Sequence, residues 1–208
     1  MIIALCGFMT SGKTLAGEAL SEKTGRKLID LDQYIEQKEG LDMESIFRKK
    51  GEAYFRKKEE ESLKEIIEKA SLKESVEDTS RKETVKSAPI KKNLGKEYDI
   101  ILSLGGGTPM NPKCAKILKE KTRCIFLTCS PKVLAERMLL LQDGRPLVKA
   151  LLVKHPNSTK KQKLQILETW AKEKLQEREP IYKACSVKTV DTSDWDIESI
   201  TAQIISSI

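Results

Sequence analysis

The sequence has few aromatic residues, a single histidine and no long hydrophobic run. Aromatic side chains make up 5% of its 208 residues, so few of them interleave with the lysines as they would on a nucleic-acid-binding surface. No stretch approaches the roughly 20 apolar residues that span a membrane, and the apolar run at 2–6 is too short for a signal peptide. We therefore expect a cytoplasmic protein with neither a membrane nor a nucleic acid as partner.

The cysteines exclude two further classes of protein. They are odd in number, scattered along the chain, and lack CxxC or Cys/His spacing, which argues against a disulfide framework and against a zinc site. We expect them to be small core residues in a reducing compartment. They are Cys6, Cys114, Cys124, Cys129 and Cys185.

The net charge of +7 leaves three explanations open. An excess of lysine fits nucleic-acid binding, a small anionic substrate or a solvated lysine-rich surface, and the lysines are spread along the chain rather than clustered. A nucleic-acid-binding module would be recognised by binding that weakens steeply with salt.

Short apolar runs alternate with amphipathic segments along most of the chain. This alternation predicts a parallel sheet covered by helices on both faces, in one α/β domain over 1–208. Residues 71–97 have little apolar content and predict a surface insertion or mobile loop, and 141–163, without a clean apolar face, predict a flap. The expected strands are 2–6, 27–29, 100–104, 123–127 and 187–190, and the expected helices are 13–24, 31–39, 43–49, 52–70, 112–119, 131–140, 164–184 and 196–205.

The segment GFMTSGKT follows the first expected strand and opens the first expected helix. This is the GxxxxGK[ST] pattern in the context that identifies a phosphate-binding loop. Backbone N–H groups at the positive end of a helix face the phosphates, a lysine reaches the β- and γ-phosphates, and a hydroxyl can ligate Mg²⁺. The candidate residues are Gly7, Thr10, Ser11, Gly12, Lys13 and Thr14.

Two aspartates, Asp30 and Asp32, follow the second expected strand. The carboxyl ends of parallel strands form the ligand-binding edge of such a sheet, so one carboxylate can face a metal and the other a second substrate. Asp is also a favourable helix N-cap, and the pair by itself leaves both explanations open.

Three further features lie later in the chain. Arg56 lies in GEAYFRKKEE, where Glu59 at i+3 and Glu60 at i+4 can hold its guanidinium. Three glycines, 105–107, follow a core strand, and their missing side chains let a small ligand approach the backbone. Arg145 lies in DGRPLV, and Arg178 in REPIY.

In this order the motifs resemble the shikimate kinase family. That family combines a P-loop, an aspartate pair as in IDLDQYIE, GExxFRxxE, a GGG loop, RPLL in a lid and RxPLY before the last strand. The resemblance covers most of the chain except 71–97. It implies a three-layer P-loop fold with a central parallel sheet flanked by helices, substrate-binding helices at about 32–70 and a mobile lid at about 141–163.

The resemblance also implies residue roles. Lys13 and the loop backbone would hold ATP, with Thr14 and Asp30 serving Mg²⁺, while Asp32 would orient the shikimate hydroxyl and accept its proton. Arg56 and Arg178 would bind the shikimate carboxylate, Gly106 and Gly107 would contact its ring and hydroxyls, and Arg145 would approach the transferring phosphoryl group. The implied reaction gives shikimate 3-phosphate on the way to chorismate and aromatic amino acids, and we expect a monomer.

Two positions depart from the family at the adenine end. The arginine often found seven residues before the lid arginine is Met138 here, with Arg137 one step earlier, and the stretch after the last strand contains Trp195. This tryptophan either stacks on the base or anchors the final helix. Rival functions are a kinase for gluconate or a nucleoside monophosphate, and a nucleotide-gated binding module.

Overall fold

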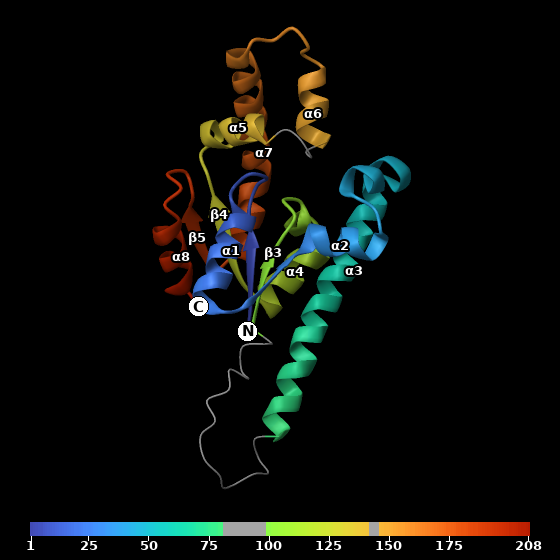
Figure 1. Ribbon diagram of the computed structural model, residues 1–208, viewed down its shortest axis with the longest axis vertical. Helices are drawn as coiled ribbons and strands as arrows, with labels where there is room; N and C mark the ends of the chain where they lie inside the picture. Colours follow the sequence, from blue (N-terminus) through green and yellow to red (C-terminus); the bar gives the residue numbers. More distant parts are fainter. Residues whose placement is uncertain (81–98, 142–145) are drawn as a thin grey trace.

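The computed structural model describes residues 1–80, 99–141 and 146–208, with the backbone alone for 72–80 and 146. Within these residues, five strands form one parallel sheet in the order β2-β3-β1-β4-β5 (Figure 1). The strands are β1 (Ile2–Cys6), β2 (Lys27–Asp30), β3 (Ile100–Ser103), β4 (Arg123–Thr128) and β5 (Lys188–Asp191). All five expected strands are present: β1 has the expected bounds, and no end of the other four is shifted by more than one residue.

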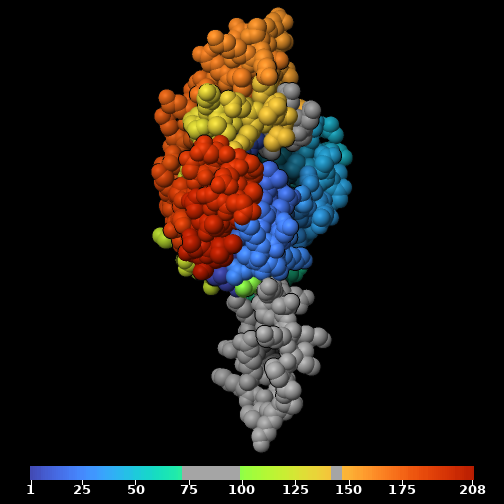
Figure 2. Space-filling view, turned by 60° about the vertical axis from the view of Figure 1, so that its left-hand side comes forward, coloured from blue at the N-terminus to red at the C-terminus, as the bar shows by residue number. Residues whose placement is uncertain are grey.

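The central strand β1 is buried on both sides, and its side chains alternate between the two faces of the sheet. Ile3 and Leu5 join the apolar cluster under α1 (Lys13–Thr24) and α8 (Ile197–Ile205), which lie side by side in Figure 2. Ala4 and Cys6 join the opposite cluster, which includes residues of α4 (Pro112–Lys121) and α7 (Lys160–Cys185). The predicted three-layer architecture is therefore confirmed.

The helices beside β2 differ from the expectation in length. After α2 (Leu31–Glu39), α3 runs over Met43–Ser80 and is interrupted at Gly51, whose φ of 81° is not helical. The interruption matches the two expected helical pieces, but the second continues to Ser80, through the first ten residues of the segment expected to be a surface insertion or mobile loop. That stretch contains no glycine or proline to end the helix, and extending an existing helix costs little. The rest of the expected insertion, 81–97, lies outside the described residues.

The expected flap is largely helical where it is described. Helix α6 (Pro146–Val153) follows α5 (Pro131–Leu140), and α7 begins at Lys160 because Thr159 and Gln162 form a capping box. Val148 and Leu152, four residues apart, are buried in a cluster with Phe8. The flap therefore does have an apolar face, which the sequence interpretation missed.

The five cysteines are buried free thiols, as expected of small core residues. Among the helices of the described residues, none combines the length and apolar character needed to cross a lipid bilayer. The loops that follow β1, β2 and β3 meet at the carboxyl edge of the sheet, because the three strands are parallel neighbours.

Candidate active site

The predicted phosphate-binding loop joins β1 directly to α1. Lys13 is largely buried, and its Nζ donates to the carbonyl oxygens of Gly7 (3.0 Å) and Phe8 (2.9 Å), which keeps the amine inside the concavity of the loop. Ser11 is fully buried, and Thr14 is exposed at the start of the helix. The loop therefore has the strand, turn and helix context of a phosphate cradle.

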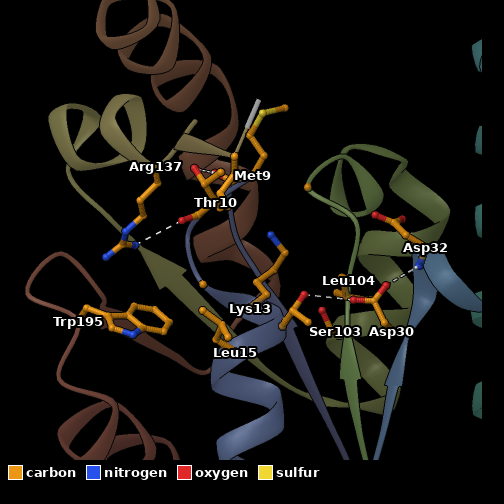
Figure 3. Close-up of a pocket in the computed structure, with 14 residues that line it drawn as sticks. Met9, Thr10, Lys13, Leu15, Asp30, Asp32, Ser103, Leu104, Arg137 and Trp195 are labelled. Carbon is orange, nitrogen blue, oxygen red and sulfur yellow. Dashed lines mark hydrogen bonds between the residues drawn. The ribbon is translucent and has the colours of Figure 1, made fainter. Parts of the chain in front are cut away.

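A pocket of about 430 Å³ opens beside this loop (Figure 3). In Figure 3 Arg137 and Trp195 lie at one end of the pocket, Asp30 and Asp32 at the other, and Lys13 between them. The wall comes from the loops after β1, β2, β3 and β5 and from the end of α5. Its residues are Met9, Thr10, Gly12, Lys13, Thr14, Leu15, Asp30, Asp32, Ser103, Leu104, Gly106, Arg137, Leu141 and Trp195.

Asp30 uses its two carboxylate oxygens for two purposes. Oδ1 accepts from the backbone N–H groups of Asp32 (3.1 Å) and Gln33 (3.2 Å), which makes Asp30 the N-cap of α2. Oδ2 accepts from the Thr14 hydroxyl at 3.3 Å. The N-cap and the pocket-facing carboxylate, which the sequence presented as alternatives, therefore coexist in one side chain.

Asp32 lies in an environment that disfavours its charge. Its Oδ1 is buried and has no hydrogen-bond partner among the described residues. Burial, followed by the nearby carboxylates of Asp30 and Glu59, raises the pKa of Asp32 to about 7, although Lys13 and Arg56 act in the opposite direction. A carboxyl group with a pKa near neutrality is suited to accept a proton.

Arg56 is held by two glutamates of its own helix. Nη1 donates to Glu59 at 2.8 Å, whereas Nε (3.3 Å) and Nη2 (3.1 Å) donate to Glu52. The expected pairing with Glu60 was wrong, because Glu60 accepts instead from Lys64 and Asn111. Glu52, one turn before Arg56, is the residue that the sequence interpretation missed; its i−4 spacing was the available signal.

The three glycines after β3 leave room for these charged groups. A Cβ on Gly107 would lie 2.5 Å from Nη1 of Arg56, and a Cβ on Gly105 would lie 2.8 Å from both Asp32 Oδ1 and Glu59 Oε1. Gly106 lines the pocket, and its carbonyl accepts from the Tyr182 hydroxyl at 2.5 Å. The carboxylates of Asp32 and Glu59 therefore lie against Gly105, which was not predicted as a site residue.

Two predicted arginines stand apart from this group. Arg178 of α7 lies over the Phe8 ring at 5.7 Å and, by its positive charge, lowers the pKa of Tyr182, although burial raises that pKa overall to about 12. Arg178 is not among the pocket-lining residues. Arg145 lies outside the described residues, so its predicted approach to the phosphoryl group is not tested.

Arg137 and Trp195 form the other end of the pocket. The guanidinium of Arg137 lies 5.0 Å from the Trp195 ring and donates to the backbone oxygens of Thr192 (2.6 Å) and Thr10 (3.3 Å). Met138 is fully buried. Leu134, Ala135 and Met138 form the buried face of α5, and Arg137 lies outside this face and lines the pocket. The apolar stripe was therefore the sequence signal that Arg137, rather than Met138, faces the pocket.

The donor set fits Mg²⁺ held together with a phosphate ligand. Such an ion needs only one or two protein oxygens, because substrate phosphates and water supply the rest. Thr14 Oγ1 and Asp30 Oδ2 are adjacent at the mouth of the phosphate-binding loop. Within the described part of the chain, no group of three or more His, Cys, Asp or Glu residues forms a protein-only metal cage.

Comparisons with known proteins agree with this geometry. The family model for shikimate kinase matches residues 9–80 and 83–208. A shikimate kinase of Thermus thermophilus is 30% identical over 206 residues, covering 99% of this chain and 89% of that protein. One of Chlorobium limicola is 31% identical over 207 residues, covering 98% and 86%.

A solved structure shows the same fold. Shikimate kinase from Acinetobacter baumannii, in complex with shikimate, aligns with a TM-score of 0.71 at 23% identity, over 98% of this chain and 90% of that one. Together with the match of the family model over nearly the whole sequence, these relatives assign the chain: it belongs to the shikimate kinase family.

Proposed function

We propose that this chain transfers the γ-phosphoryl group of ATP to a hydroxyl of shikimate, giving shikimate 3-phosphate. The observation that carries the proposal is the position of Asp32. Its half-buried carboxyl group lines the pocket at the opposite end from Trp195, beyond the P-loop lysine, and within the electrostatic influence of both Lys13 and Arg56. A phosphoryl donor and an acidic, hydroxylated acceptor can therefore meet at this carboxylate.

The nucleotide side of the site consists of the loop and its helix. Backbone N–H groups from Gly7 to Thr14 and the amine of Lys13 bind the phosphates, and the buried Ser11 and Thr10 shape the loop. Thr14 and Asp30 hold Mg²⁺, which neutralises phosphate charge when bound. Positioning and positive charge supply most of the catalysis in phosphoryl transfer.

The acceptor side of the site lies between α2, α3 and the glycine loop. Asp32 orients the reacting hydroxyl and accepts its proton, while Arg56 and Arg178 bind the carboxylate of shikimate. Gly106 and Gly107 leave the backbone open to the ring and its hydroxyls. The planar guanidinium of Arg56 is already held by Glu52 and Glu59, so little freedom is lost on binding.

Beyond the residue roles proposed above, three further expectations concern parts that the structure does not describe or the protein's surroundings, and they remain predictions. They are the approach of Arg145 when a lid closes, a monomeric protein, and a cytoplasmic location without nucleic-acid or membrane partners. The protein as a single domain over 1–208 also remains a prediction.

A coupled assay of ADP release tests the proposed function. We expect Mg²⁺-dependent turnover with shikimate, and none above background with gluconate or nucleoside monophosphates at equal concentration. No turnover with shikimate would overturn the proposal. Salt-sensitive binding to nucleic acid without turnover would support the rival binding module instead.

Substitutions at Asp32 and Arg56 distinguish the proposed role in catalysis from the proposed role in binding shikimate. We expect Asp32→Asn to lower kcat about 100-fold or more with little change in ATP affinity, because proton acceptance and hydroxyl orientation are lost. We expect Arg56→Lys to raise the KM for shikimate about 10-fold, since an ammonium group cannot form two parallel hydrogen bonds to a carboxylate. Lys57→Ala, on an exposed neighbouring position, is the matched control and should leave both constants unchanged.

A further inference from the structure

Thr108 makes a buried hydrogen bond that none of the site roles above uses. It begins the short 3₁₀ helix η2 (Thr108–Met110) directly after the glycine loop, and its hydroxyl donates to Glu59 Oε1 at 2.5 Å. Both side chains are fully buried, so neither can touch a bound substrate. A hydroxyl hydrogen-bonded to a carboxylate out of contact with water is among the stronger hydrogen bonds in proteins.

Glu59 connects this hydroxyl to Arg56. Its other oxygen, Oε2, accepts from Arg56 Nη1 at 2.8 Å, so the carboxylate has one donor on each oxygen. The fit is close, because a Cβ on Gly105 would lie 2.8 Å from Glu59 Oε1 and 3.2 Å from Thr108 Oγ1. Thr108 thereby sets the orientation of the carboxylate that orients the guanidinium.

We propose that Thr108 is a positioning residue for shikimate binding, acting through Glu59 on Arg56. This inference rests on the proposed function, in which Arg56 binds the substrate carboxylate. Without the hydroxyl, Glu59 Oε1 would be a buried acceptor with one donor lost, and the carboxylate would rotate toward whatever donor remains. The guanidinium of Arg56 would then either move with the Glu59 carboxylate or lose its hydrogen bond to it. In both cases the guanidinium would no longer be preorganised for substrate binding.

The test compares Thr108→Val with Thr108→Ser. Valine keeps the shape and removes the hydroxyl, whereas serine keeps the hydroxyl. We expect Thr108→Val to raise the KM for shikimate, and its dissociation constant measured by calorimetry with ADP present, about 10-fold. The KM for ATP should stay within about 2-fold of the parent value, and Thr108→Ser should return shikimate binding to within about 3-fold.

Asn111→Ser provides a matched control on the same loop. Asn111 ties the loop to the same helix by donating to Glu60 at 3.1 Å, and it caps α4 by accepting from the Lys113 N–H. Serine preserves a cap and removes the tie to Glu60. Because this control loosens the same contact between elements without touching Glu59, its KM for shikimate should remain that of the parent protein.

The results distinguish this inference from the proposed function. If the parent protein does not turn over shikimate, the proposed function fails. If the parent is active but a folded Thr108→Val protein binds shikimate normally, the positioning role is wrong. Equal rises in the KM for shikimate and for ATP, or an equal effect of Asn111→Ser, would indicate general loosening and would also overturn it.

Discussion

At the scale of single residues, the site places carboxylates where their charge is costly. Among the described residues, one buried oxygen of Asp32 has no hydrogen-bond partner, and two other carboxylates lie nearby. Such an arrangement is unfavourable for the folded chain alone, and in the proposed function a substrate hydroxyl and cations would offset the cost. In the ligand-free protein, the ionised carboxylate of Asp32 should therefore lower the free energy of unfolding by a measurable amount.

This cost predicts a dependence of stability on pH. Burial and the neighbouring carboxylates raise the pKa of Asp32 from 3.8, the ordinary value of an aspartate, to about 7, so the folded state prefers the protonated group. The contribution of Asp32 to stability is fully present below about pH 4 and is lost as the pH rises to about 7. We expect Asp32→Asn to be more stable than the parent at pH 8, by a few kcal/mol at most, and nearly equal at pH 4.

Urea denaturation with EDTA and without substrates measures this difference. Asp42→Asn is a suitable control, because hydrogen bonds from Ser45 lower the pKa of Asp42, so neutralising it should give no gain at pH 8. Equal stability of Asp32→Asn and the parent at pH 8 would contradict the predicted cost.

At the scale of elements, the connection between α2 and α3 helps to place Arg56 against the glycine loop that follows β3. Helix α2 ends at Gly40, whose φ of 62° and ψ of 24° lie in the left-handed region, and its N–H donates to the carbonyl of Glu36. A Cβ at this position would meet no atom of the described part of the chain within 4 Å. The need for glycine here is therefore conformational rather than steric.

We expect Gly40→Ala to lower the free energy of unfolding by about 1 kcal/mol, the typical cost of placing a Cβ in left-handed backbone. Gly40→Asn should lose less, because asparagine tolerates this conformation. Thermal or urea unfolding of the three proteins measures the order glycine, asparagine, alanine. An alanine variant as stable as the parent would show that the turn relaxes to another conformation.

The ends of two helices show what the local sequence pattern can and cannot predict. The start of α7 at Lys160 depends on a capping box, Thr159 with Gln162, which is readable from the sequence but was overlooked in favour of the later apolar stripe. The continuation of α3 to Ser80 depends on a helix already formed upstream, and such continuation leaves no periodic signal of its own.

At the scale of the whole molecule, the pocket joins the first and last parts of the chain. Trp195, after the last strand, lies against the phosphate-binding loop so closely that a Cβ on Gly12 would lie 2.1 Å from its ring. It also packs on the apolar cluster that contains Ile200. The two roles considered for Trp195, anchoring α8 and facing the nucleotide, are thus compatible, and contact with the base remains a prediction.

Fluorescence tests that prediction. In a Trp170→Phe protein, Trp195 is the sole tryptophan, and we expect MgADP to change its emission with a saturable dependence on concentration. The cause is that a nucleotide on the loop displaces water from the ring and alters its contact with Arg137. Trp195→Phe with Trp170 retained should show little change, and an unchanged emission from Trp195 would place the base elsewhere.

The features of this protein that depend on neighbours along the chain were predictable from its amino-acid sequence. The alternation of apolar runs with amphipathic helices predicted the parallel sheet, and the spacing of Gly7, Gly12 and Lys13 predicted the phosphate-binding loop between β1 and α1. The order of the later motifs predicted the family. These features are readable because strand burial, turn geometry and helix starts are set by residues a few positions apart.

The contacts that hold the candidate site together became visible only in the folded arrangement. The raised pKa of Asp32, the hydrogen bond from Thr108 to Glu59 and the placement of the Arg137 guanidinium over the Trp195 ring each depend on residues from different elements. Burial and charge at such points are sums over side chains that meet only when the chain has folded, so no local pattern contains them. For that reason Gly105, Thr108 and Arg137 were identified as site residues from packing, whereas Glu59 was already expected beside Arg56 from its i+3 spacing.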